Sequence, residues 1–192
     1  MRPYSKVLLA SASPRRRELL RLVFPQFEVL AADADETPTE TEPCRMVEQL
    51  ALRKARAVAK RPEAADSLVI GADTLVFAQG AVLGKPKDEQ DALAMLRSLS
   101  GTTHQVITGV ALTLHGAERV FSEVTEVEFA PMTEEEMQAY VASGDPMDKA
   151  GAYGIQGGAS RFIRGIRGCY FNVVGLPVHR LYEEWKAWIE QE

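Results

Sequence analysis

The sequence predicts a mixed α/β fold, in which one sheet carries both parallel and antiparallel strands. The apolar run Lys6–Ala10 is followed by a turn and then by apolar residues at helical spacing, which is the pattern of a strand–helix unit. Two long strand-like runs, Gln105–Leu114 and Glu118–Phe129, are joined at His115-Gly116 as the strands of a hairpin are. Strand–helix units favour parallel pairing and hairpins give antiparallel pairing, so we expect a mixed sheet, with a cleft between an N-terminal lobe and a middle-to-C-terminal lobe.

The first half of the chain is expected to alternate strands with helices. Ser13 is the expected N-cap, and Pro14 the first residue, of a helix whose apolar spacing continues to Val23. The elements expected after it are a strand at Phe27–Ala31, an acidic loop at Asp33–Pro43, a helix from about Cys44 to Lys60, a strand at Ser67–Ile70 that ends at Gly71-Ala72-Asp73-Thr74, a hairpin at Leu75–Leu83 turning near Gln79-Gly80, and a helix at Lys87–Leu99.

The second half continues from the long hairpin into helices and a glycine-rich stretch. Thr133 and Glu136 form a capping-box pattern that predicts a helix to about Ala142. The elements expected after it are a glycine-rich stretch at Gly144–Gly158, two short strands broken at Gly168, and a terminal helix from Pro177. No linker separates independent domains, so residues 1–192 are expected to form a single domain.

Composition excludes several classes of partner. The chain has 192 residues, with 22 lysines and arginines against 27 aspartates and glutamates and a net charge of −5, which argues against a broad basic face for a nucleic acid polymer. No apolar run approaches the roughly 20 residues of a membrane span. Met1–Leu9 lacks the apolar stretch of a signal peptide, so we expect a cytoplasmic protein with no membrane partner. Cys44 and Cys169 have no metal-type spacing and are interpreted as ordinary thiols.

Arg15, Arg16 and Arg17 stand in the first turn of a predicted helix, where the helix dipole disfavours cations. An anion bound there would reverse that cost. With the hydroxyls of Ser11 and Ser13, these guanidinium groups would form a phosphate cradle. The alternative is a solvated basic turn with local salt bridges.

Lys54 and Asp73 also depart from simple folding patterns. Lys54 lies within the apolar stripe of its predicted helix, so it either extends to the rim or reaches a site that holds negative charge. Asp73 follows Gly71 and Ala72 at the expected end of a buried strand, the sheet edge where open α/β folds bind ligands. An ordinary turn aspartate is the alternative.

Two further segments carry polar groups beside flexible backbone. The loop Asp33–Glu36 offers carboxylates that would hold a hard cation such as Mg²⁺ together with Asp73, or form a solvated acidic turn. Gln156 lies within Gly151–Gly158, where four glycines in eight positions permit close approach to a ligand, or simply form a connecting loop. Walker, GxGxxG and GxSxG motifs are absent.

Eight segments, in this order, resemble the Maf family of nucleoside triphosphate pyrophosphatases over nearly the whole chain. They are Ser11-Ala-Ser-Pro-Arg-Arg16, Asp35-Glu36, Lys54, Gly71-Ala-Asp-Thr74, Gly84-Lys-Pro86, Gly101-Thr-Thr-His-Gln105, Gly151-Ala-Tyr-Gly-Ile-Gln156 and Asn172-Val-Val-Gly-Leu-Pro177. The resemblance implies a mixed α/β fold with two lobes around a deep cleft, related to the inosine triphosphate pyrophosphatase group. A homodimer is one expectation, because family members are often dimers.

The resemblance also implies roles for individual residues. Asp73 matches the catalytic base, and Glu36 matches a residue that holds a divalent cation, Mg²⁺ or Mn²⁺, together with Asp73. The remaining matches bind the phosphates or influence substrate choice: Ser13, Arg16, Lys54 and Lys85 for the phosphates, and Arg15, Thr74 and Gln156 for specificity. Of these, Thr74 carries no signal of its own.

The implied reaction is hydrolysis of a nucleoside triphosphate substrate to the monophosphate and pyrophosphate. The segment around Gln156 is similar to the family branch acting on dTTP and UTP, rather than the branch acting on 7-methyl-GTP, and a glutamine amide can pair with the edge of uracil or thymine. The alternatives are a non-catalytic nucleotide-binding regulator of cell division, or the same hydrolysis acting on 7-methyl-GTP or other modified nucleotides. The sequence also leaves open whether Asp73 or a metal-bound hydroxide is the operative base.

Overall fold

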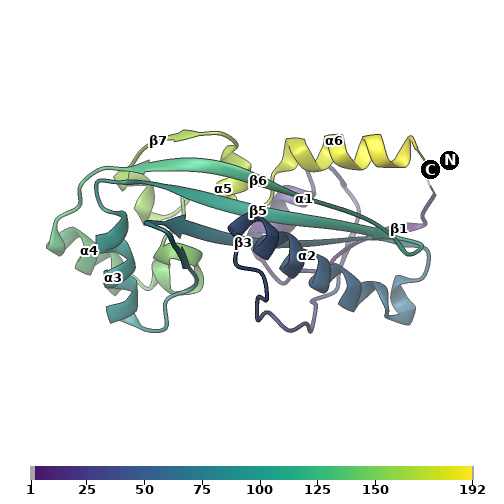
Figure 1. The fold of residues 1–192 in the computed structure, drawn as a ribbon, viewed down its shortest axis with the longest axis horizontal. Helices are drawn as coiled ribbons and strands as arrows, with labels where there is room; N and C mark the ends of the chain where they lie inside the picture. Colours follow the sequence, from purple (N-terminus) through teal and green to yellow (C-terminus); the bar gives the residue numbers. More distant parts are fainter. Residues whose placement is uncertain (1–2, 192) are drawn as a thin grey trace. The chain divides into compact units, whose positions relative to one another are not determined.

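A computed structural model describes residues 3–191 and gives the mixed α/β fold that the sequence predicts. Met1 and Arg2, which begin the segment expected not to be a signal peptide, lie outside the described residues. Figure 1 shows the strands and the helices along the chain: β1 (Lys6–Leu9), α1 (Pro14–Leu20), β2 (Glu28–Val29), α2 (Pro43–Ala59), η1 (Pro62–Ala64), β3 (Ser67–Ala78), β4 (Ala81–Leu83), α3 (Glu89–Leu99), β5 (Thr103–Leu114), β6 (Ala117–Phe129), α4 (Glu134–Ala142), η2 (Asp145–Asp148), η3 (Ala150–Ala152), η4 (Gly158–Phe162), β7 (Ile163–Arg167), α5 (Tyr170–Val174) and α6 (Val178–Ile189).

The sheet runs in the order β2-β1-β3-β5-β6-β7, with β4 paired to β3. β1 is parallel to β2 and β3, whereas the β3–β4 and β6–β7 pairs are antiparallel. The turn between β5 and β6 has positive φ at His115 and Gly116, as the tight turn of a hairpin requires. The mixed sheet is therefore confirmed.

The chain forms two compact units. Unit 1 comprises the described residues up to 73, residues 108–123 and the described residues from 175 onward; unit 2 comprises residues 74–107 and 124–174. Strands β3, β5 and β6 each pass from one unit to the other. Within residues 3–191, no helix is both long enough and apolar enough to cross a bilayer.

In unit 1, α2 and α6 cover opposite faces of the sheet (Figure 1). Neighbouring residues of β6 point to opposite faces: Arg56 of α2 pairs with Glu118 at 2.6 Å, whereas Arg119 donates to Glu184 of α6 at 2.7 Å. The face under α2 is apolar along most of the helix, with a core that includes Ala51, Ala55, Val58 and Val69. The exception on this face is Lys54.

β3 corrects one prediction. The strand runs from Ser67 through Gly71 to Ala78, so Asp73 lies inside a strand and not past its end. Gly71 does not end the strand; it makes room for the helix above it. A Cβ at this position would lie 2.3 Å from Ala51 O and 2.8 Å from Ala55 N of α2.

Two other elements differ from the expected pattern. α1 ends at Leu20 and not near Val23. The chain turns there, and the Leu20 carbonyl accepts the backbone N–H groups of Val23 and Phe24. The segment after Gly168 is the helix α5 and not a second short strand. In α5 the buried amide of Asn172 donates to Val106 O at 3.0 Å, a bond that this helical turn provides.

In unit 2, helices α3 and α4 pack on a core that includes Leu96, Leu99, Val127, Phe129 and Met137. His104 is 2% exposed in this unit, with Nε2 2.7 Å from Tyr153 Oη and its ring edge-on to Phe129. Burial lowers the pKa of His104 from 6.5 to about 4, so the ring is neutral at pH 7.

This burial predicts a pH dependence of stability. Between pH 6.5 and about 4 the unfolded chain protonates His104 while the folded chain does not, so the free energy of unfolding should fall by about 3 kcal/mol as the pH is lowered through this window. Urea denaturation from pH 7 to pH 4 would measure it, with His104→Gln as the comparison. Equal pH dependence in both proteins would contradict the prediction.

Candidate active site

The first turn of α1 is organised around Arg16. Ser13 is the N-cap, as predicted, and its hydroxyl accepts the Arg16 N–H at 3.4 Å. The Arg16 guanidinium turns back toward the chain: Nε donates to Gly175 O at 2.9 Å, and Nη1 donates to Ser11 Oγ at 3.4 Å. Arg17, by contrast, is exposed. Of the two, Arg16 is therefore the guanidinium that hydrogen bonds to Gly175 and Ser11 hold in a fixed position within unit 1.

Lys54 lies between two carboxylates. Its Nζ is 2.6 Å from Asp73 Oδ1 and 3.0 Å from Glu36 Oε1. The Lys54 and Asp73 side chains are 11% and 17% exposed, whereas Glu36 is 68% exposed. Of the two alternatives for Lys54, the structure therefore selects the one in which the ammonium group reaches negative charge.

Arg16 belongs to the same electrostatic cluster. Burial lowers the pKa of its guanidinium, and the nearby charge of Arg15 acts in the same direction, whereas the carboxylates of Asp73 and Glu36 raise it. An arginine stays charged throughout the physiological range. Unit 1 thus brings together two cations and two carboxylates that are far apart in the sequence.

The acidic loop divides into two roles. Asp35 Oδ1 accepts the backbone N–H of Thr37 at 2.8 Å, and this bond lowers the pKa of the Asp35 carboxyl. Glu36 instead reaches Lys54. Among residues 3–191, no group of three or more histidine, cysteine, aspartate or glutamate side chains is arranged to hold a metal ion. The loop therefore supplies one carboxylate to the cluster.

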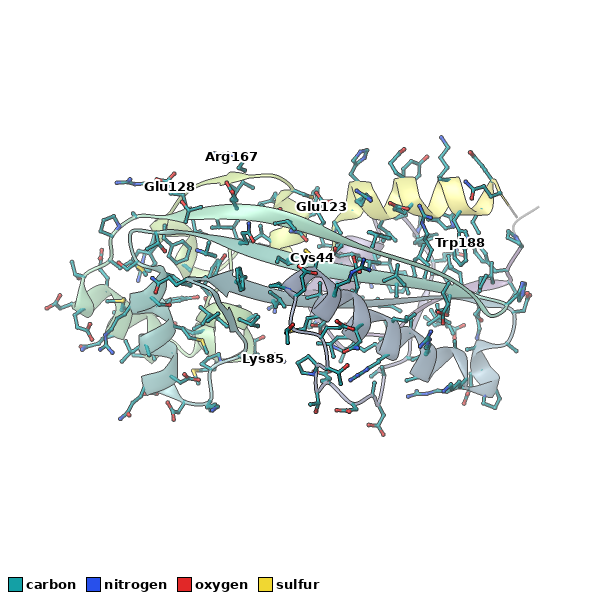
Figure 2. All side chains as sticks on the ribbon, viewed as in Figure 1. Cys44, Lys85, Glu123, Glu128, Arg167 and Trp188 are labelled. Atoms are coloured by element: carbon teal, nitrogen blue, oxygen red, sulfur yellow. The ribbon has the colours of Figure 1, made fainter. Side chains whose placement is uncertain are left out.

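The other predicted site residues belong to unit 2. Thr74 follows Asp73 in β3, so the pleat directs its side chain to the opposite face of the strand. Lys85 follows β4 and is exposed (Figure 2). Gln156 is exposed in a turn whose Gly157 N–H donates to Gly154 O at 3.0 Å. The roles of these three residues stay predictions.

Sequence reasoning missed partners that hold the predicted residues in place. The Gly175 carbonyl that accepts from Arg16 lies inside the segment Asn172–Pro177, which carried the resemblance without a role. Tyr140 and Asp145, which lie against Gly158 and Gly157 in the turn around Gln156, had no signal in the sequence. Their contacts join residues 18 and 12 positions apart through an irregular segment, where no periodicity applies.

The fold and the cluster define the chain as a mixed α/β protein with a charged site built on one face of β3. A family model described as "Maf-like protein" matches residues 6–188. The chain belongs to the Maf family.

Several relatives are similar over nearly the full length. A dTTP/UTP pyrophosphatase of Geobacillus sp. (strain WCH70) is 52% identical over 94% of this chain and 97% of the relative. Proteins of the same name from Carboxydothermus hydrogenoformans and Symbiobacterium thermophilum are 47% and 54% identical, over 95% and 91% of this chain and 98% and 90% of the relatives. Among solved structures, the Staphylococcus aureus Ham1 protein has a TM-score of 0.46 at 19% identity, covering 66% of this chain and 72% of that one.

Proposed function

We propose that this chain hydrolyses dTTP and UTP to the nucleoside monophosphate and pyrophosphate. The relatives of that name, about half identical over nearly the whole chain, support the substrates. The observation that carries the chemistry is the Asp73 carboxylate, 17% exposed and hydrogen-bonded to Lys54 within a cluster that also contains Arg16.

Asp73 acts as the general base in this proposal. Lys54 bonds to Oδ1 and fixes the orientation of the carboxylate, which leaves Oδ2 to accept the proton of the attacking water. Water attack at the α phosphorus breaks the bond to the bridging oxygen and releases pyrophosphate. Positioning and charge stabilisation supply most of the catalysis in phosphoryl chemistry, so the cations around Asp73 matter as much as the base.

The charges of the cluster explain why further positive charge is needed. Arg16 and Lys54 are balanced by Asp73 and Glu36, so the four groups have no net formal charge. A triphosphate adds several negative charges. Ser13, Arg15 and Lys85 are proposed to bind the phosphates together with Arg16 and Lys54, and the remaining charge requires a divalent cation.

Glu36 and Asp73 would hold that cation. They offer the hard oxygen ligands that Mg²⁺ and Mn²⁺ prefer, and they already converge on one cationic group, Lys54 Nζ. Two carboxylates are the usual protein contribution to a magnesium site, with phosphate oxygens completing it. When bound, the cation would neutralise charge on the substrate oxygens.

Gln156, Arg15 and Thr74 are proposed to set substrate choice. Uracil and thymine present one N–H between two carbonyl oxygens. The oxygen of the glutamine amide can accept this N–H, and its NH₂ group can donate to one of the carbonyl oxygens. We also propose a homodimer, which the family resemblance implies, and a cytoplasmic location.

The experiment is to measure pyrophosphate and orthophosphate released from dTTP, UTP, CTP, dATP, GTP and 7-methyl-GTP with Mg²⁺ or Mn²⁺. We expect pyrophosphate from dTTP and UTP. Turnover of 7-methyl-GTP instead would keep the reaction and overturn the role of Gln156. Binding of nucleotides without release of pyrophosphate would favour the non-catalytic regulator.

A further inference from the structure

The turn that carries Gln156 packs against the side chains of Tyr140, Asp145 and Lys149. Within unit 2 the turn is closed by the bond from Gly157 N–H to Gly154 O. Gln156 itself is exposed, and a flexible exposed glutamine would cost rotational entropy when it pairs with a base. The backbone beneath it therefore decides how well the amide is placed.

Tyr140 and Asp145 pack against the part of this turn that follows Gln156. Tyr140 is 2% exposed, and its hydroxyl donates to Asp145 Oδ2 at 2.8 Å. A Cβ at Gly158 would lie 3.3 Å from Cδ2 and Cε2 of the Tyr140 ring, and the Asp145 carboxylate lies against Gly157. Two side chains that are hydrogen-bonded to each other therefore support the backbone immediately after Gln156.

Lys149 completes the arrangement from the other side. Its Nζ is 3.2 Å from Asp145 Oδ1, and its side chain is 14% exposed. The methylene groups of Lys149 lie against Gly154, where a Cβ would come within 2.8 Å of Cδ and Cε. Gly157 is equally crowded, since a Cβ there would lie 2.5 Å from Asp145 Oδ2. The glycines of this segment are thus accounted for by contacts with the protein's own side chains.

We infer that Tyr140, Asp145 and Lys149 form a clamp that positions the Gln156 turn and thereby sets the preference for uracil and thymine over cytosine. The inference rests on the proposed function, in which Gln156 pairs with the base. These are positioning residues, because they act through the turn and not on the substrate.

The chemistry of the bases makes such a clamp necessary. Cytosine presents an acceptor and an amino donor where uracil presents a donor and a carbonyl acceptor, so a glutamine amide rotated by half a turn pairs with cytosine equally well. Discrimination requires that one orientation of the amide be reachable and the other not. A turn fixed at both ends can hold the amide in one place relative to the base, whereas a loose turn accepts both pairings.

The test compares Asp145→Asn and Tyr140→Phe with the full-length wild-type chain, using kcat and KM for UTP, dTTP and CTP. Both variants should raise KM for UTP about tenfold with little change in kcat, and lower the UTP-over-CTP ratio of kcat/KM about tenfold. In a chain that also carries Gln156→Ala, the clamp variants should change neither quantity further, because their effect passes through Gln156. Glu135→Gln is the matched control, because it removes one carboxylate charge from the same helix as Tyr140 at an exposed position outside the clamp.

Thermal melting establishes that each variant is folded, and Tyr140→Phe decides the matter if Asp145→Asn does not fold. If a folded clamp variant has an unchanged UTP-over-CTP ratio of kcat/KM, the inference is overturned. The proposed function still stands in that case, provided that the wild-type protein hydrolyses UTP. A uniform loss of kcat for all three substrates, or an additional loss in the Gln156→Ala chain, overturns the inference too, because either result indicates a merely structural role. Wild-type protein that releases no pyrophosphate from UTP or dTTP overturns both proposals together.

Discussion

Replacing Asp73 with asparagine should lower the release of pyrophosphate from dTTP and UTP by about 10²- to 10⁴-fold. The asparagine side chain has nearly the same shape, but its amide cannot take the proton of the attacking water. It also removes one of the two carboxylates that Lys54 contacts and leaves Glu36, which is 68% exposed. The loss should appear in kcat, and it should be measured with a coupled pyrophosphate assay at saturating nucleotide.

Asp35→Asn is the matched control for this substitution. Asp35 neighbours Glu36 in the same loop, but it caps Thr37 and lies 3.9 Å from Arg53, so its neutralisation should leave turnover near that of the wild type. If Asp73→Asn kept wild-type kcat, Asp73 would not be the base. If it abolished nucleotide binding instead, measured by a ligand-induced rise in melting temperature, the carboxylate would serve the site mainly as a structural partner of Lys54.

The part of the site in unit 1 could be predicted because its residues violate local rules. A lysine within an apolar helical stripe and an arginine in a first helical turn are each unfavourable by themselves, and the structure places both beside the carboxylates of Asp73 and Glu36. A charged residue at such an unfavourable helical position can be recognised in a single sequence, because the helical period alone identifies the position. The helical period does not identify the partners; Asp73 and the loop Asp33–Glu36 were singled out separately, by the expected strand end and by the acidic run.

What could not be predicted depends on contacts between distant segments. Gly71 resembles a strand end, since glycine weakens strands, yet β3 continues because α2 lies against it. The segment after Gly168 has the apolar composition of a strand, yet it folds as a helix that brings the Asn172 amide to Val106 O. The clamp around Gln156 brings Tyr140 to Gly158 and Asp145 to Gly157 through irregular backbone, where no pattern of spacing exists.

Gly71→Ala should be the most destabilising single methyl addition on the face of β3 that carries Asp73. The added Cβ would lie 2.3 Å from Ala51 O and 2.8 Å from Ala55 N, which are backbone atoms of α2 and cannot rotate aside as a side chain can. Overpacking of a core typically costs 1–3 kcal/mol, and a backbone obstacle places this site at about 3 kcal/mol, or roughly 6–12 °C in melting temperature for a chain of this size.

The same substitution tests how the fold positions the chemistry. Lys54 lies on α2 between Ala51 and Ala55, so a helix pushed away from β3 carries its ammonium away from the Asp73 carboxylate. Turnover should therefore fall at temperatures where the variant is still folded. Gly165→Ala is the control, because a Cβ on this strand glycine meets nothing within 4 Å and should leave stability unchanged or slightly raised. A Gly71→Ala protein with wild-type melting temperature would mean that α2 does not press on β3 as closely as this geometry requires. If the Gly71→Ala protein melted at a lower temperature but kept full turnover while folded, the placement of Lys54 would not depend on how closely α2 packs on β3.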